Sequence, residues 1–159
     1  MIELVKNFNK LAVSHYAMLK KNLTAITSEE LDWQPHPEAN TVRWIIGHLR
    51  WFEDWVPDAI ETRGRYGKDK GPQAYPFDDL EHLFVDFDQA NERRTKVYKS
   101  LSKPDLKREV DYFGAYHVSL EKLIRTHAGH MAGHRYQIRY IRAMYSRVNR
   151  TDKAVFDPW

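Results

Sequence analysis

The sequence contains no cysteine. A chain without cysteine forms no disulfide, offers no thiolate ligand to a metal ion and has no cysteine nucleophile, and its composition fits a reducing compartment. Any thiol that takes part in the chemistry of this protein must therefore arrive with a ligand.

Long apolar runs are also missing. No window approaches the roughly 18 consecutive apolar residues that predict a membrane-spanning helix. The first residues, MIELVKNFNKLAVSHYAMLKKNL, contain neither an uninterrupted apolar core nor the small-residue cleavage site of a secretory signal peptide. We therefore expect a soluble, cytoplasmic protein that makes no membrane contact.

A large excess of charge of either sign is absent as well, because 25 basic and 22 acidic residues give a net charge of +3. The densest basic cluster recurs at helical spacing, which is typical of a solvated helix face and argues against a nucleic-acid partner. This cluster consists of Arg135, Arg139, Arg142, Arg147 and Arg150.

Aromatic residues, by contrast, are abundant: the chain has five Trp, nine Tyr and seven Phe. Most of them should lie in the core or at an interface, because their rings bury large areas. With 159 residues the chain has the size of one domain, and it is long enough to fold without a structural metal. We expect a single domain over residues 1–159, in which any metal is functional.

Four segments show the hydrophobic period of an amphipathic helix. They run from about residue 2 to 23, from about 41 to 62, from a cap at Asp78 or Asp79 to a stop before Pro104, and from about Ser119 to 147. Pro57 predicts a kink or an early end of the second helix near Val56.

The connections between these helices are of several kinds. TSEELDWQPHPEANT, with two prolines, predicts a break after the first helix, and DLKREVDYFGAY holds either a short extended segment or an irregular loop. Four long helices without convincing strands predict an all-α fold, namely a four-helix bundle with long connections between some helices.

The stretch RTHAGHMAGHRYQIRYIRAMY carries three histidines on the inward arc of the last predicted helix: His127, His130 and His134. Burial of an imidazole without a partner is unfavourable, so three of them on one core face need an explanation. Three core histidines that are each satisfied by neighbours are the ordinary alternative. Because imidazole is the commonest metal ligand, three on one face favour a metal site instead.

Helical spacing selects among these histidines. His130 and His134 stand at i and i+4 and can both turn towards one ion. His127 and His130, at i and i+3, are a second pair, but all three extend over roughly 10 Å of helix axis, too far for one ion. A third ligand should come from another helix, and His48 is the histidine of the second predicted helix.

Motifs of other metal proteins are absent. The sequence has neither the Glu-x-x-His pairs of a di-iron bundle nor the His-Glu-x-x-His motif of a metalloprotease. Further polar candidates near the site are Gln137, one turn beyond His134, and Arg50, Glu53 and Asp54 on the second helix.

Glycine and tryptophan mark the two helices that carry these histidines. Gly129 and Gly133 each cost about 1 kcal/mol relative to alanine in a helix, which close packing against another helix or access to the metal would offset. Trp44, Trp51 and Trp55 share a face with His48, and the pattern fits either core residues or the lining of a pocket.

Two stretches resemble the DinB superfamily of metal-dependent bundle proteins, which includes YfiT-like proteins and enzymes that use bacillithiol or mycothiol. LDWQPHPEANTVRWIIGHLRWFEDW is similar to the loop and second helix that carry a metal-binding histidine of the family, and HAGHMAGHRYQIRYI is similar to its H-x-x-x-H-R-G-Q-I segment. The resemblance covers essentially the whole chain.

The resemblance implies that His48, His130 and His134 are the metal ligands, which is the set that helical spacing favours. It places His127 outside the triad, as a neighbour, with Gln137, Trp44 and Trp51 around the site. Tyr136 stands where the family often has glycine, which would narrow the site or its access.

Three neutral imidazoles leave a divalent ion, most simply zinc or nickel, with open positions for water or a thiolate. We therefore predict a metal-dependent transferase that adds a low-molecular-weight thiol to a small-molecule electrophile, with a metal-dependent hydrolase as the nearest alternative. An alternative of another class is a non-catalytic metal-binding stress-response protein that acts as a homodimer, with the tryptophan-rich helix in its interface.

Overall fold

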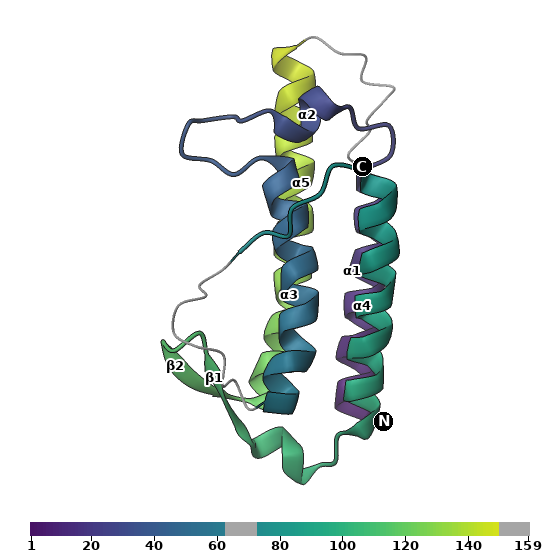
Figure 1. Ribbon diagram of the computed structural model, residues 1–159, viewed down its shortest axis with the longest axis vertical. Coiled ribbons are helices and arrows are strands. Elements are labelled where there is room, and N and C mark those ends of the chain that lie inside the picture. The colour runs from purple at the N-terminus through teal and green to yellow at the C-terminus, as the bar shows by residue number, and fades with distance from the viewer. Residues whose placement is uncertain (63–72, 150–159) are drawn as a thin grey trace.

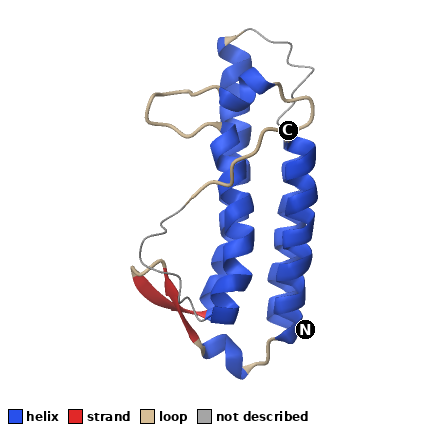
Figure 2. Cartoon of the chain, in the orientation of Figure 1, coloured by secondary structure: helices blue, strands red, loops and turns tan. Residues whose placement is uncertain are grey.

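The computed structural model describes residues 1–62 and 73–149. These residues are mostly helical, which confirms the predicted all-α class (Figure 2). The elements in chain order are α1 (Glu3–Asn22), α2 (Ser28–Asp32), α3 (Val42–Thr62), α4 (Leu80–Ser100), the 3-10 helix η1 (Pro104–Lys107), β1 (Glu109–Tyr112), β2 (Tyr116–Ser119) and α5 (Leu120–Val148).

The four long helices lie along one another (Figure 1). α1 and α5 run in one direction, and α3 and α4 both run in the other. Because α3 and α4 are parallel neighbours, the chain must return over the length of a helix between them. The long connection expected from the sequence serves this purpose, and residues 73–77, which we call the strap, cross α3 on the way to α4.

Side-chain caps at Thr27, Thr41, Asp79 and Ser119 fix the beginnings of α2, α3, α4 and α5. The side chain of Asp79 accepts hydrogen bonds from the backbone N–H groups of Glu81 and His82 at the start of α4. The Ser119 hydroxyl accepts from the N–H of Lys122 at the start of α5. Each cap satisfies a backbone donor that the first turn of a helix otherwise leaves unpaired.

The early end that Pro57 predicts near Val56 does not occur, and the predicted break after α1 is present but holds an additional short helix. α3 continues through Pro57 to Thr62, because the burial of Val56, Ala59 and Ile60 in the core outweighs one lost backbone hydrogen bond. The predicted break after α1 contains the short helix α2, whose cap is Thr27 and which ends before the first proline of that stretch.

The segment that the sequence left open between an extended structure and a loop forms a β-hairpin. β1 and β2 pair antiparallel, and buried Val110 lies opposite buried Val118. Phe113 and Gly114 make the turn with positive φ angles of 57° and 70°, and Asp111 accepts a hydrogen bond from the Gly114 N–H. The hairpin therefore adds a small sheet at the end of the molecule where α5 begins (Figure 1).

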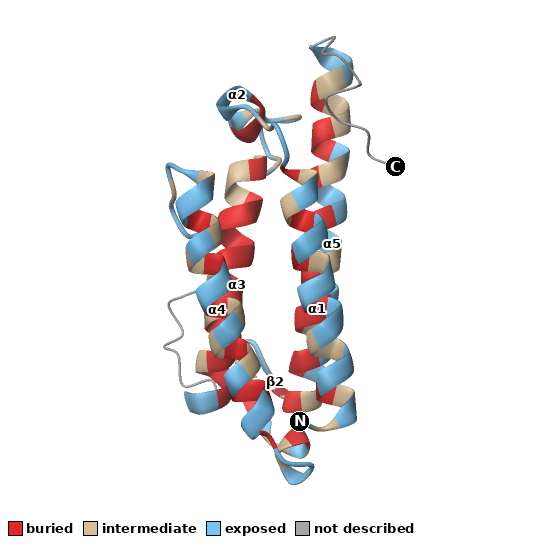
Figure 3. Ribbon diagram, turned by 90° about the vertical axis from the view of Figure 1, so that its right-hand side faces the viewer, coloured by how far each residue is buried: buried red, intermediate tan, exposed pale blue. Residues whose placement is uncertain are grey.

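The buried side chains form two apolar clusters, one towards each end of the long helices (Figure 3). The first cluster contains the start of α1 and α5 and the end of α3 and α4, with Val5, Ile60 and Leu123 as examples. The second contains the opposite ends, with Leu19 and Ile45 as examples. A polar layer, which consists of Asn9, Glu53, Arg94 and His127, occupies the positions between them along the four helices.

The predicted solvated arginine face is wrong for two of its members, because Arg135 and Arg142 are buried. Arg142 donates to the carboxylate of Glu30 and to the backbone carbonyls of Asn22 and Thr24. Arg139 is half-buried, Arg147 is exposed, and Arg150 lies outside the described residues. Within the part of the chain that the structure describes, no helix is both long and apolar enough to cross a membrane.

Candidate metal centre

Three histidines from two helices meet between α3 and α5. The Nε2 atom of His130 lies 3.1 Å from Nε2 of His48 and 3.1 Å from Nε2 of His134. One ring nitrogen from each residue lies within 4.8 Å of the others, so the three could hold one metal ion. The structure thus brings together the residues that the sequence proposed as ligands, although 82 residues separate His48 from His130.

Neighbouring groups set the tautomers of the two outer histidines. The Nδ1 atom of His48 lies 2.8 Å from the backbone oxygen of Gln73. A carbonyl oxygen only accepts, so this Nδ1 carries the hydrogen and Nε2 of the neutral ring keeps a lone pair. The Nδ1 of His134 lies 2.9 Å from Oε1 of Gln137, which produces the same tautomer.

The central histidine, His130, cannot form good hydrogen bonds with both of these neighbours at once. A single hydrogen on Nε2 of His130 would serve one of the two facing lone pairs well and leave the other unpaired. Its Nδ1 is buried and has no hydrogen-bond partner among the described residues. A cation that accepts three lone pairs removes this conflict, so the chemistry of the donor set fits a metal ion.

The spacing of the nitrogens also fits. Two imidazole nitrogens at 2.0–2.1 Å from one tetrahedral zinc ion lie about 3.3 Å apart. The separations from His130 to His48 and to His134, both 3.1 Å, are close to this value, and all three nitrogens lie within 4.8 Å of one another. Little movement of the side chains is therefore needed to hold an ion.

Burial keeps the triad neutral. Burial, together with the neighbouring histidines, lowers the pKa of His130 to about 3. Burial likewise lowers the pKa values of His48 and His134. A neutral imidazole is the form that binds a metal, so the site needs no deprotonation near pH 7.

Aromatic rings surround the triad. Trp44 stacks on His48 with the ring centroids 4.9 Å apart, and Trp51 lies 5.6 Å from the same imidazole on α3. Phe52 lies 4.2 Å from the ring of His130. Trp55 is buried in the apolar core and contacts Phe52 instead of the triad.

The strap reaches the site because α3 has a glycine at the crossing. The Tyr75 N–H donates to the Gly47 carbonyl at 2.9 Å. A Cβ atom at position 47 would lie 2.4 Å from the Tyr75 backbone oxygen, far inside van der Waals contact. Gly47 therefore allows the approach that puts the Gln73 carbonyl on His48.

The two glycines of α5 are in a different situation. A Cβ atom at Gly129 or Gly133 would have no neighbour within 4 Å among the described residues. The expectation of close helix packing at these positions is therefore wrong within the described chain, and access to the metal stays a prediction. Tyr136 on the same helix is 54% exposed and stacks against the guanidinium of Arg135.

His127 lies outside the triad. Its Nε2 atom is 2.7 Å from Oε2 of Glu53, and both side chains are buried. The second carboxylate oxygen of Glu53 accepts from Nε of Arg94, and Arg94 also donates to Asn9 and Asn91. This polar layer lies directly beside the candidate metal centre, because His127 is one turn from His130.

The electrostatics of the layer favour a charged carboxylate and a neutral imidazole. Burial alone would raise the pKa of Glu53, but the interactions with His127 and Arg94 hold that pKa at about 2. Burial lowers the pKa of His127 in spite of the opposing effect of Glu53. His127 therefore donates Nε2–H to the carboxylate and keeps a lone pair on Nδ1.

Sequence reasoning named Glu53 as a polar candidate and missed Arg94. The signal was present, because Arg94 falls on the same helical stripe as the buried residues Phe87, Ala90 and Val97. The other two candidates on α3 pair with each other, Arg50 with Asp54, and not with the triad.

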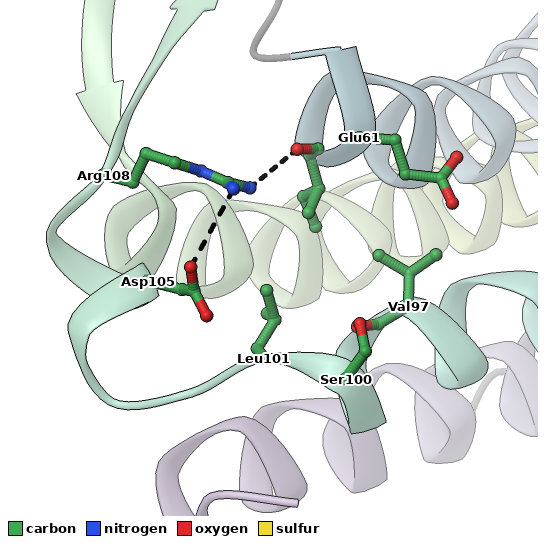
Figure 4. A pocket seen from close by; sticks show the side chains of 7 residues that line it. Glu61, Val97, Ser100, Leu101, Asp105 and Arg108 are labelled. Atoms are coloured by element: carbon green, nitrogen blue, oxygen red, sulfur yellow. Dashed lines mark hydrogen bonds and ion pairs between the residues drawn. The ribbon is translucent and has the colours of Figure 1, made fainter.

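An open cavity among the described residues lies away from the triad (Figure 4). Its volume is about 260 Å³, and its lining comes from the ends of α3 and α4 and from η1: Ile60, Glu61, Val97, Ser100, Leu101, Asp105 and Arg108. The Arg108 guanidinium donates to the Ile60 carbonyl at 2.7 Å on one side of it. About 18 Å of helix rise separates Ile60 from His48, so this cavity is not part of the candidate metal centre.

Comparison with models of protein families gives a match. A family model described as the DinB superfamily matches residues 12–138. The matched range contains the whole histidine triad and the polar layer except Asn9. No curated protein matches the chain.

Proposed function

The chain belongs to the DinB superfamily, and from this membership and its histidine triad we propose that it is a metal-dependent transferase that adds a low-molecular-weight thiol to a small electrophile. The observation that carries the proposal is the convergence of one nitrogen each from His48, His130 and His134 within 4.8 Å. As part of the proposal, residues 1–159 are one domain and the four long helices are the four-helix bundle of the superfamily.

The donor set supports a divalent ion with free positions. Three imidazoles suit zinc or nickel, and the group of potential ligands within the described residues contains no fourth member. When bound, such an ion would lower the pKa of a thiol and hold it as the thiolate. The chain has no cysteine, so the thiol must be a cosubstrate. We propose a cytoplasmic protein, which would meet low-molecular-weight thiols in that compartment.

The residues of the chain itself position the site. The Gln73 carbonyl and the Gln137 amide orient the imidazoles of His48 and His134. Trp44 and Trp51 cover His48 with apolar surface, which excludes water from that side and suits a small apolar electrophile. A hydrolase is the less favoured reaction, because no carboxylate of the described residues joins the triad as a general base.

A non-catalytic metal-binding homodimer is the second candidate, and one observation favours it. Tyr136 and Tyr140 are 54% and 62% exposed and share a face of α5 with the open positions Gly129 and Gly133. Such a face suits a second copy of the chain. Trp44 and Trp51 are half-buried and lie against His48, and Trp55 is buried in the core, so we place the interface on α5.

Metal analysis of untagged protein tests the site. We expect about one divalent ion per chain in the wild type and substoichiometric metal in His48→Ala, His130→Ala and His134→Ala, because each variant removes one of three ligands. His127→Ala should keep most of its metal, and His82→Ala, which removes an exposed histidine, is the matched control. Unchanged metal content in His48→Ala would refute a site shared between α3 and α5.

Turnover tests the reaction. Metal-loaded wild type and His130→Ala are compared on physiological thiols with a panel of small electrophiles, and on a panel of esters. Thiol addition by the wild type that is lost in His130→Ala is the expected result. Bound metal without turnover, together with a dimer in sedimentation analysis, would favour the second candidate.

A further inference from the structure

Two buried ring nitrogens beside the triad have no hydrogen-bond partner in the described chain: Nδ1 of His130 and Nδ1 of His127. Both residues lie on α5 at i and i+3, a spacing that places side chains next to each other on one helix face. Phe52 packs against both imidazoles, with ring centroids 4.2 Å from His130 and 6.0 Å from His127. The two residues with unpaired nitrogens therefore lie next to each other on one buried face of α5, under the same phenylalanine.

Their hydrogen-bonding roles are complementary. His127 donates Nε2–H to the Glu53 carboxylate at 2.7 Å, so its Nδ1 is an acceptor. If Nε2 of His130 binds an ion, which rests on the proposed function, the neutral ring carries its hydrogen on Nδ1 and is a donor. A donor and an acceptor, each buried and otherwise unpaired in the described chain, therefore lie on neighbouring side chains of α5.

The Glu53 carboxylate, which accepts the hydrogen bond of His127, is itself held in place by buried partners. Glu53 and Arg94 are both 0% exposed, and Arg94 is fixed in turn by Asn9 and Asn91. The carboxylate is therefore in a position that solvent does not reach. Its orientation fixes which nitrogen of His127 bears the hydrogen.

We propose that Glu53 and His127 are positioning residues for the metal ligand His130. Glu53 holds His127 as the Nε2–H tautomer, and Nδ1 of His127, directly or through one water, accepts the Nδ1–H of His130. A ligating histidine whose second nitrogen donates to such a partner is oriented and is a stronger base towards the metal. Here a second histidine extends the usual carboxylate–histidine–metal arrangement by one ring.

A purely structural role makes a different prediction. Arg94 would still pair with Glu53 if position 127 carried an apolar ring, and a phenylalanine would fill the space of the imidazole. In that case His127→Phe would leave metal affinity unchanged. The zinc affinity of His127→Phe therefore distinguishes a positioning role of His127 from a purely structural one.

The test is the zinc affinity of the full chain, measured by competition with a chromophoric chelator. We expect His127→Phe and Glu53→Gln to bind zinc about tenfold to a hundredfold more weakly than the wild type. Glu30→Gln is the matched control, because Glu30 is also a buried carboxylate paired with an arginine, and its affinity should stay within about twofold.

The outcomes separate this inference from the proposed function. A wild type that binds no zinc refutes the metal site itself. A wild type that binds zinc, with folded His127→Phe and Glu53→Gln variants of the same affinity, overturns only the role of the two positioning residues.

Nitrogen-15 NMR of the histidine rings in the wild-type protein is a second measurement that needs no variant to fold. We expect His127 as the Nε2–H tautomer with and without zinc, and a slowly exchanging Nδ1–H on His130 in the zinc-loaded protein. A hydrogen on Nδ1 of His127, or rapid exchange of the His130 Nδ1–H, would contradict the arrangement.

Discussion

Two glycines within helices of this protein should respond in opposite ways to substitution by alanine, because their surroundings differ. Gly47 faces the backbone of the strap, whereas Gly129 faces open space. Helix propensity alone favours alanine over glycine by about 1 kcal/mol at both positions. The surroundings must therefore decide the sign of a substitution.

Gly47→Ala should lower the free energy of unfolding by about 1–3 kcal/mol, because the new methyl group clashes with backbone that cannot rotate away. Gly129→Ala, the matched control, should raise the free energy of unfolding by up to about 1 kcal/mol. Urea denaturation monitored by circular dichroism measures both. A stabilised Gly47→Ala variant would mean that the strap does not lie on α3 at Gly47.

At the scale of the elements, a buried ion pair ties α5 to the connection between α1 and α2. Arg142 donates to both carboxylate oxygens of Glu30 in α2, at 2.5 and 3.1 Å, and to two carbonyls where α1 ends, those of its last residue Asn22 and of Thr24 in the turn that follows. These bonds satisfy the last carbonyls of α1, which have no partner within the helix. One side chain thus holds three helices together.

Arg142→Met should cost about 3–5 kcal/mol in the free energy of unfolding, because it leaves the Glu30 carboxylate buried without its partner. The double variant Arg142→Met with Glu30→Met should recover a large part of that loss, since an apolar pair of similar volume often replaces a buried ion pair without penalty. Urea denaturation of the two single variants and the double variant forms the test. Additive losses would show that Arg142 acts mainly through the carbonyls of α1.

At the scale of the whole molecule, the core is divided by ionisable groups. Asn9, Glu53, Arg94 and His127 from four different helices separate the two apolar clusters, and the triad adds further buried imidazoles. Neutral buried histidines bind fewer protons than they do in the unfolded chain. The stability of the metal-free protein must therefore depend on pH.

The sign follows from the direction of the shifts. The pKa of His130 falls from the ordinary value of 6.5 in the unfolded chain to about 3 in the folded protein. Because the unfolded chain then binds the proton more strongly, the free energy of unfolding is at its full value above pH 6.5 and decreases as the pH falls towards 3. At pH 5 the loss from His130 alone is about 2 kcal/mol. The pKa of Glu53 lies below its ordinary value of 4.5, so the stability that this carboxylate contributes is complete above pH 4.5 and is lost only as the pH falls below that value, outside the range from pH 5 to pH 7.5.

We expect the metal-free protein, kept in chelator, to have a lower free energy of unfolding at pH 5 than at pH 7.5 by at least about 2 kcal/mol. His130→Gln should show a smaller difference between the two pH values, and His82→Gln, an exposed control, should match the wild type. Equal stability of the wild type at pH 5 and pH 7.5 would contradict the burial of neutral histidines.

Much of the element order could be predicted from the sequence. The first helix was expected at about residues 2–23 and is Glu3–Asn22, and the caps at Asp79 and Ser119 are present. These features are local, because hydrophobic period and capping depend on residues within one or two turns. The continuation of α3 through Pro57 was not predictable in this way, since packing with other helices decides it.

The sequence by itself determined the helix lengths, the all-α class and the face of α5 that carries the histidines, because a helical period is complete within a few residues. The tertiary structure decided which buried groups meet: His48 with His130, Glu53 with His127 and Arg94, and Arg142 with Glu30. These partners lie between 41 and 112 residues apart in the chain. The physical reason is that a buried charge or imidazole needs a partner in space, and the packing of the helices, rather than the spacing along one of them, brings that partner to it.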